Sequence, residues 1–409
     1  MGFELIDGVL KMHAFHAVSF GIIVLFLGRQ LNQRYRLLSE FSIPEPVSGG
    51  IVVSILLTLI YAVFAVEVEF DLAARNLLLI YFFTTIGLNA NLKDLLKGGK
   101  PLVILLVVTI GYMAIQNLTG ISVAKAFDLE SAVGLLGGSV SLIGGHGTAI
   151  AWAPQIKEEF GIDSAVEMGI ACATFGLILA SIMGGPIAKY LITKYDLKPN
   201  QEDLASPDNV SEDENKRITS YEFLDAILAI HFTIFLGLFL DRAIEATGLQ
   251  LPFFVSCLFA GIILTNVIPA NRKRISGMKW PSRTPAIHLI AEISLGTFLS
   301  MSLMSMQLWV LVDLAGPIIA ILGAQFIVAI LVNIFIVFRV MGKSYDAAVI
   351  CSGFGGISLG STPTAMANMS AVSNKYGNSA VAFIVVPLVC AFFIDLANAL
   401  MIPYFLSNF

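Results

Sequence analysis

Long runs of apolar side chains restrict the fold of this chain more than any other feature of its sequence. Two of them, Val47–Val66 and Gly316–Phe338, contain no charged residue. Each is long enough to cross the hydrocarbon core of a bilayer as a helix, which takes about 20 residues. Of the 409 residues, 57% are hydrophobic and 13% are charged, whereas about a quarter of the residues in soluble domains are charged. The chain is therefore predicted to be an all-α membrane protein with many spans.

Hydropathy predicts about ten crossing helices. They cover residues 12–28, 47–66, 75–92, 101–124, 165–188, 222–246, 252–270, 286–309, 315–338 and 379–405. Two further apolar segments, 131–152 and 347–368, are interrupted by glycine. We expect both to be re-entrant loops, which enter the membrane and return to the side they left. The N-terminal residues lack a basic stretch followed by a cleavage site, so we expect no removable signal peptide and a retained first span.

The distribution of basic residues supports the re-entrant loops and sets the orientation. With both loops returning, 19 of the 24 Lys and Arg residues fall on one side and five on the other. Cytoplasmic connections carry the excess of basic residues in membrane proteins. Both termini are therefore predicted to lie outside, and the acidic segment 196–220 to be a cytoplasmic linker. It separates a first half, 1–195, from a second half, 221–409, with five spans each. An odd number of spans inserts the second half upside down.

Matching residues in the two halves indicate an internal repeat of this inverted kind. An offset of 216 relates Pro101 to Pro317, Asn117 to Asn333, Val133 to Val349, Gly144 to Gly360, Thr148 to Thr364 and Ala149 to Ala365. The same offset relates the two interrupted segments. Inverted repeats with paired broken helices are typical of secondary transporters. A channel has no comparable need for two equivalent halves, so we expect transport by alternating access.

The interrupted segments have the composition of an anion site. Backbone that is not helical at membrane depth must line a cavity or be buried in protein, and a helix N-terminus presents free N–H groups with a partial positive charge. In the first segment we expect a new helix to begin at Thr148, and in the second a Ser or Thr before Pro363 to cap one. The predicted substrate-binding residues are Gly144, Gly145, His146, Gly147, Thr148, Gly360, Ser361, Thr362 and Thr364. Alternatively, the glycines only allow close helix packing.

Every Lys and Arg falls in a predicted connection, which limits how an anionic substrate can be held. Backbone N–H groups, hydroxyls and His146 are the expected ligands, or else a cation at the membrane boundary. The candidate boundary cations are Arg29, Lys189, Arg242 and Arg339. His146 is either a proton relay or substrate ligand, as ionisable groups within membranes often are, or a neutral turn residue that donates a structural hydrogen bond.

The final span contains the acid that is best placed for a coupling ion. Asp395 precedes Asn398 by about one helical turn on the same face, and carboxylate and amide oxygens suit a hard cation such as sodium. The pair could instead make a structural hydrogen bond between helices. Ser141 and Asn89 complete the predicted sodium ligands; Asn89, at the end of the third span, either lines the cavity or terminates its helix. Glu292 is a weaker candidate, as a proton carrier.

Other classes of function find little support. The four cysteines lie in apolar segments without a CxxC pair, so they are expected to be buried small residues, and no cofactor or metal beyond sodium is predicted. A membrane hydrolase could use Ser141 with His146, but neither GxSG nor GxGD occurs, so we do not expect an enzyme. Nothing indicates a nucleic-acid partner.

Seven motifs occur in the order found in one family, and the chain resembles the bacterial sodium/glutamate symporters. The motifs are IPEPVSGG (43–50), FFTTIGLNANL (82–92), GGHGTAIAW (144–152), ACATFGL (171–177), MGKSYDAAV (341–349), STPTAMANM (361–369) and FFIDLANAL (392–400). The resemblance covers nearly the whole chain except the N-terminal tail and the linker. The sequence departs from the family mainly in the linker and in the connection 271–285.

The resemblance implies a substrate, a location and an assembly. Members of the family import L-glutamate with sodium across the bacterial inner membrane, as homodimers in which a transport domain moves against a scaffold. The chemistry of the interrupted segments alone is less specific, because helix N-termini accept any carboxylate. Aspartate, or a di- or tricarboxylate coupled to protons or sodium, therefore remains the alternative.

Overall fold

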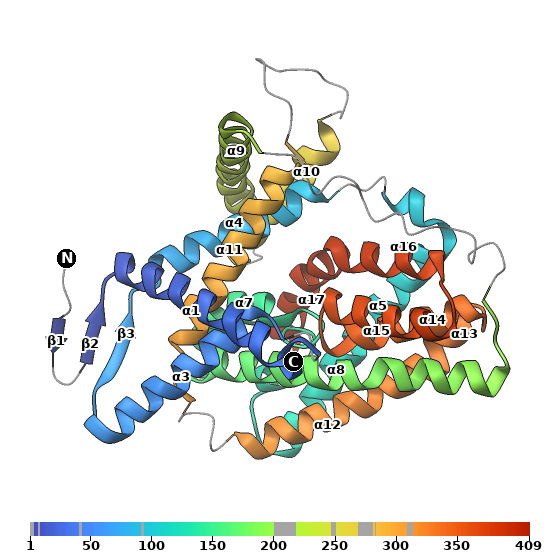
Figure 1. Ribbon diagram of the computed structural model, residues 1–409. Coiled ribbons are helices and arrows are strands. Elements are labelled where there is room, and N and C mark those ends of the chain that lie inside the picture. Colours follow the sequence, from blue (N-terminus) through green and yellow to red (C-terminus); the bar gives the residue numbers. More distant parts are fainter. Residues whose placement is uncertain are drawn as a thin grey trace.

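The computed structural model describes residues 4–6, 9–40, 43–90, 94–199, 218–246, 251–268, 281–282, 284–308 and 314–409. This part of the chain is almost entirely helical (Figure 1). Most of the predicted linker and of the connection 271–285 lies outside the described residues.

The helices of the first half follow the predicted order. They are α1 (Ala14–Arg34), α2 (Arg36–Glu40), α3 (Glu45–Phe64), α4 (Ala73–Asn89), α5 (Asp94–Ala126), α6 (Ser131–Leu136), α7 (Gly145–Phe160) and α8 (Ala165–Tyr195). The first interrupted segment comprises α6, a turn and α7. Long α5 contains a break at Gly99, whose φ of 57° is outside the helical region.

The second half repeats much of this order. Its helices are α9 (Ser220–Glu245), α10 (Phe253–Val267), α11 (Pro285–Met304), α12 (Ala315–Val332), α13 (Phe338–Val340), α14 (Tyr345–Leu359), α15 (Thr362–Tyr376), α16 (Ala380–Leu388) and α17 (Ile394–Asn408). Two π-helical turns, η4 (Asn333–Val337) and η5 (Val389–Phe393), join α12 to α13 and α16 to α17. The second interrupted segment comprises α14 and α15.

Each predicted span overlaps a helix, and seven helical stretches among the described residues are long and apolar enough to cross a membrane. These stretches are Ala14–Arg34, Glu45–Phe64, Gly99–Ala126, Ala165–Tyr195, Ser220–Glu245, Pro285–Met304 and Ala315–Val340. Of the remaining predicted spans, two correspond to α4, with 17 residues, and α10, with 15. The last corresponds to α16 and α17, which η5 separates.

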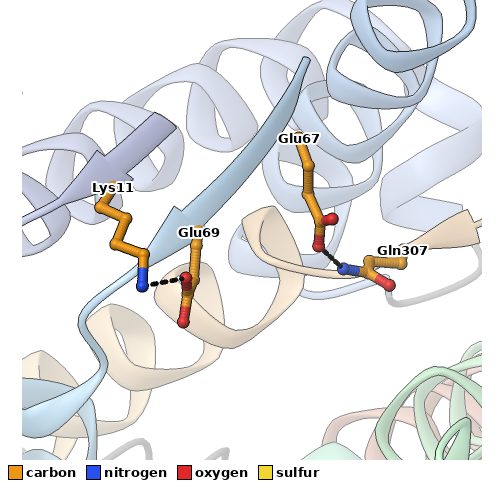
Figure 2. Close-up of polar contacts among 4 residues, drawn as sticks. All are labelled: Lys11, Glu67, Glu69 and Gln307. Carbon is orange, nitrogen blue, oxygen red and sulfur yellow. Dashed lines mark hydrogen bonds and ion pairs between the residues drawn. The ribbon is translucent and has the colours of Figure 1, made fainter. Parts of the chain in front are cut away.

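The prediction of an all-α fold was wrong at one place, a small three-stranded sheet. β1 (Glu4–Ile6) pairs antiparallel with β2 (Val9–Met12), and β2 pairs parallel with β3 (Glu67–Phe70). In β3 charged and apolar residues alternate, which is the period of a strand with one face covered. Lys11 and Glu69 are paired across the sheet, and their side chains form a 3.4 Å ion pair (Figure 2). The sheet ties the chain before α1 to the α3–α4 connection.

The helices pack as two groups that each draw on both halves of the chain (Figure 1). In the first helix group, defined as α1, α3, α4, α9, α10 and α11, helix α4 lies between α10 and α11. Gly87 on α4 and Gly261 on α10 let the two backbones approach closely, since a Cβ on Gly261 would come within 2.8 Å of the Gly87 carbonyl carbon. Close approach at small residues is the usual way in which helices pack in membranes.

The second helix group comprises α5–α8 and α12–α17 and contains both interrupted segments. Helix α8 packs on α7, α14 and α15, and α5 packs on α6, α12 and α16. Large side chains such as Trp152, Tyr112 and Phe354 are fully buried within it. The two groups meet where α7 contacts α11.

A polar contact also joins the two groups beyond the end of α11. The Gln307 side chain donates to Glu67 of β3 (2.6 Å; Figure 2), and the Gln307 backbone N–H donates to Glu167 at the start of α8 (3.3 Å).

Candidate functional site

A cavity of about 470 Å³ lies between the two helix groups and contains most of the predicted substrate site. Its wall on the side of the first group is largely apolar, with Phe82 and Phe83 of α4 and Leu295 and Leu299 of α11. Its wall on the side of the second group is polar. The predicted residues that line this wall are Gly144, Gly145, His146, Gly147, Thr148, Gly360, Ser361, Thr362 and Asp395.

In the first interrupted segment, the new helix begins three residues earlier than predicted. Helix α7 starts at Gly145 and not at Thr148, because Gly145 takes a φ of 71° that turns the chain into the helix. This left-handed conformation is open to glycine and costly for other residues. Gly144 is needed for space, since a Cβ there would lie 2.6 Å from the Val140 carbonyl oxygen. The first turn of α7 thus faces the cavity with its unpaired N–H groups.

In the second interrupted segment, the helix starts within one residue of the predicted position. Helix α15 begins at Thr362 with Pro363 in its first turn and Ser361 in the N-cap position, although the Ser361 side chain makes no capping hydrogen bond to the backbone. The hydroxyls of Ser361 and Thr364 are hydrogen-bonded at 3.1 Å, and Thr364 is fully buried behind the cavity.

The two segments are close neighbours. A Cβ on Gly145 would lie 4.0 Å from the Gly360 carbonyl oxygen. Two helix N-termini, each with a partial positive charge, therefore face one cavity.

His146 is 6% exposed and hydrogen-bonds through Nε2 to the Thr174 hydroxyl of α8 at 3.0 Å. That hydroxyl donates its own proton to the Ile170 carbonyl (2.9 Å). It therefore accepts from His146, which places the imidazole proton on Nε2 and leaves Nδ1 as the possible acceptor. This geometry matches the predicted turn residue that donates a structural hydrogen bond, in a ring that also lines the cavity.

Three of the four predicted ion ligands, Asp395, Asn398 and Ser141, belong to the second helix group. Asp395, in the first turn of α17, lines the cavity. Asn398 is 1% exposed and donates through Nδ2 to the Ser139 carbonyl (3.3 Å). Its Oδ1, together with the hydroxyls of Ser141 and Ser139, is buried without a hydrogen-bond partner among the described residues. Buried oxygens without partners are uncommon in proteins, and these three suit a hard cation. No pattern in the sequence singled out Ser139.

Other candidates lie elsewhere. Asn89 ends α4 as a half-buried residue outside the cavity lining. All four boundary cations, Arg29, Lys189, Arg242 and Arg339, are exposed and absent from the lining. Arg75, expected in a connection, is buried in the first turn of α4, where its Nη1 lies 3.5 Å from the Ser302 hydroxyl.

The charges in the cavity lining are acidic. Glu45 at the start of α3 and Glu292 on α11 line the cavity from the first helix group, and Asp395 lines it from the second. Among the residues described, the lining includes no Lys or Arg. Glu45 belongs to the IPEPVSGG motif, so its sequence context was visible, but its placement at the cavity follows only from the packing of α3.

Comparison with known proteins places the chain in a family. Residues 10–378 match the family model described as sodium/glutamate symporter. The sodium/glutamate symporter of Escherichia coli strain K12 is 41% identical over 387 residues, which cover 94% of this chain and 95% of the relative. The sodium/glutamate symporter of Haemophilus influenzae is 39% identical over 389 residues, with the same shares covered.

The chain is also distantly similar to a protein of known structure. A sodium proton antiporter from Methanocaldococcus jannaschii is 13% identical, with a TM-score of 0.43, and the match covers 96% of this chain and 98% of that one. A similarity this low does not indicate a shared function. The family match and the relatives agree over almost the whole chain, and the chain therefore belongs to the sodium/glutamate symporter family of membrane transporters.

Proposed function

We propose that this protein imports L-glutamate by sodium symport across the bacterial inner membrane. The family match and the names of the relatives support this function. The observation that carries it is the cavity itself, where the N-termini of α7 and α15 face a space that Asp395 also lines. Sodium is the coupling ion, and the chemistry requires no further cofactor.

The charges of the cavity explain why the substrate needs sodium. Glutamate carries a net negative charge, and the described lining offers it three carboxylates and no Lys or Arg. Two unlike charges 4 Å apart attract by about 4 kcal/mol at an effective dielectric constant near 20. A bound cation therefore offsets the repulsion, while the N–H groups of Gly145–Thr148 and those of Thr362 and Thr364 bind the substrate carboxylates. The hydroxyls of Ser361 and Thr362 add further donors.

The ion is bound behind the substrate by oxygens of the second helix group. Asp395 supplies the negative charge, and the unpaired oxygens of Asn398, Ser141 and Ser139 supply neutral ligands. Asn398 also donates to the Ser139 carbonyl, so the last helix and the first interrupted segment hold the ion together. Asn89 takes no part in this arrangement.

The proposed topology has ten spans in two inverted repeats, 1–195 and 221–409, with re-entrant loops 131–152 and 347–368. Equivalent asparagines support it. The Ser139 N–H donates to Asn117 Oδ1 (2.8 Å), and Asn333 Nδ2 donates to the Cys351 carbonyl (2.8 Å), so each holds the interrupted segment of its own half. Both termini lie outside, and the linker 196–220 is cytoplasmic. In a homodimer, the first helix groups form the scaffold, and the second groups move to expose the site to either side.

Uptake into proteoliposomes tests this function. The purified protein is expected to concentrate labelled L-glutamate under an inward sodium gradient, and to fail with potassium or with a proton gradient alone. Aspartate and citrate serve as competitors, since helix N-termini alone accept any carboxylate. Uptake driven by protons, or stronger competition by citrate than by unlabelled glutamate, would keep a transporter but replace the proposed substrate. Absence of any carboxylate flux would reject transport.

A further inference from the structure

Two buried glutamines connect the halves of the chain in a crossed pattern. Gln116 on α5, in the first half, donates through Nε2 to the Ser358 carbonyl (2.8 Å) near the end of α14 in the second half. Gln325 on α12, in the second half, donates through Nε2 to the Gly137 carbonyl (3.1 Å) at the end of α6 in the first half. Both side chains are fully buried.

A third hydrogen bond joins the two glutamines directly. The same Nε2 of Gln325 also donates to the backbone carbonyl of Gln116 (2.7 Å). This bond links α5 to α12 at the two glutamines, and each glutamine also binds an interrupted segment of the opposite half. The asparagines described above, Asn117 and Asn333, hold the segments within their own halves. Each interrupted segment is therefore held by an asparagine of its own half and by a glutamine of the other.

The carbonyls that the glutamines hold belong to helix ends. Gly137 is the C-cap of α6, and Ser358 lies in the last turn of α14. The last four carbonyls of a helix have no partner within it, and in a buried place water is not available to replace one. The amide donor therefore fixes where each helix ends, a few residues before the N-terminus that faces the cavity. Among the described residues, loss of such a donor leaves the Gly137 carbonyl unpaired and the Ser358 carbonyl with only a long contact to the Tyr112 hydroxyl (3.5 Å), which is costly.

We propose that Gln116 and Gln325 are positioning residues that couple the two interrupted segments, so that sodium bound at the first segment changes the affinity for glutamate at both. The proposal rests on the proposed function. Without the glutamine bonds, Asn398 still binds the Ser139 carbonyl and Asn368 the Ala180 carbonyl, but the ends of α6 and α14 lose their amide links to α12 and α5. The two helix N-termini then lose their common register. Loss of these bonds is expected to weaken the coupling between sodium and glutamate binding. Both binding surfaces are expected to remain, because neither glutamine lines the cavity.

The variants Gln116→Met and Gln325→Met test this role. Methionine is close in shape to glutamine but cannot donate. Each glutamine also has an Oε1 with no partner among the described residues, so the exchange removes an unpaired buried oxygen as well as a donor. Thr109→Val on α5 is the matched control, because Thr109 is equally buried but its hydroxyl donates only to the Leu105 carbonyl of its own helix (2.7 Å).

Glutamate binding to the purified variants is measured by calorimetry over a series of sodium concentrations. We expect the factor by which saturating sodium raises glutamate affinity to fall about tenfold in either glutamine variant, as the loss of its hydrogen bond to the opposite segment implies. Thr109→Val is expected to match the wild type. Equal sodium dependence in all four proteins would overturn the proposal.

Hydrogen exchange gives a second readout that does not require binding. Gln116→Met is expected to speed exchange in the peptide around Ser358, across the halves, and Gln325→Met in the peptide around Gly137. Faster exchange only within each variant's own helix would contradict the crossed role. If a methionine variant fails to fold, Gln116→Asn, which shortens the donor, serves for the same measurement. Wild-type protein without sodium-dependent glutamate binding would reject the proposed function and this coupling together; an intact wild type with unchanged variants rejects the coupling alone.

Discussion

Replacing Gly145 with alanine tests whether the N-terminus of α7 binds the substrate. Gly145 has a φ of 71°, and a Cβ there would meet nothing closer than the Gly360 carbonyl oxygen at 4.0 Å. The added methyl group therefore has room, and the cost lies in the backbone alone. A left-handed conformation costs an L-residue about 1–2 kcal/mol, which is a factor of roughly 5 to 30 at 25 °C.

We expect this backbone cost to lower the affinity for the substrate. Alanine at position 145 favours a negative φ, which turns the first N–H groups of α7 away from the cavity. The fraction of protein in the binding geometry falls, and the apparent dissociation constant rises by the same factor. We therefore expect Gly145→Ala to raise the KM for glutamate uptake in proteoliposomes by about 5- to 30-fold, measured at saturating sodium.

Gly161 provides the matched control at the other end of the same helix. It has a φ of 67°, nothing within 4 Å of a Cβ, and no part in the cavity lining. Gly161→Ala thus has the same backbone cost and is expected to lower thermal stability as much as Gly145→Ala while leaving KM unchanged. A wild-type KM in Gly145→Ala, or an equal rise in KM in Gly161→Ala, would refute the assignment of this helix N-terminus to substrate binding.

Three further substitutions probe the ion site, the charges and the helix packing. Asp395→Asn replaces the charged ion ligand by an amide, so the sodium concentration for half-maximal uptake is expected to rise by about tenfold or more; an unchanged value would remove Asp395 from the ion site. Glu292→Gln removes one negative charge opposite the substrate, and charges ~10 Å apart at a dielectric constant near 20 interact by about 1.7 kcal/mol. Competition by glutarate, which lacks the ammonium group, should therefore strengthen about tenfold relative to glutamate, and equal ratios in both proteins would count against this charge effect. Gly87→Ala places a Cβ 2.3 Å from the Leu258 carbonyl oxygen, where α4 crosses α10, and should destabilise the protein by about 1–3 kcal/mol. Gly185→Ala, which meets nothing within 4 Å, should leave thermal unfolding in detergent unchanged.

The sequence was sufficient to place the helices and the two interrupted segments because hydrophobic length and glycine are local signals. The apolar runs predicted helices that the structure contains, and the Ser-Thr-Pro pattern predicted a helix start at Pro363, within one residue of the observed start of α15 at Thr362. The start of α7 was predicted three residues late, since glycine can take either sign of φ and the sequence does not show that Gly145 takes the positive one. The small sheet was missed because each of its strands is short and is stabilised by pairing far along the chain.

The candidate site was predictable where a motif carries it and not where packing does. The glycines, His146, Ser361 and Asp395 were identified from their own short motifs, and the structure brings them to one cavity. Asn89 has the same polar character but faces elsewhere, because the rotation of α4 is set by its contacts with α10 and α11. No sequence pattern identified Gln116 and Gln325, since the carbonyls they bind in the opposite half lie more than 180 residues away along the chain.

Glutamate binding to the wild-type protein, with and without sodium, tests the central claim most directly. The cavity presents helix N-termini and carboxylates but, within the described part of the chain, no cationic side chain. Titration calorimetry on the purified protein is therefore expected to show glutamate binding in sodium chloride and at least about 100-fold weaker binding in potassium chloride at equal ionic strength, as a single cation next to the substrate implies. The same affinity in both salts would show that the protein binds its anion without the coupling ion, and would contradict the account of this site.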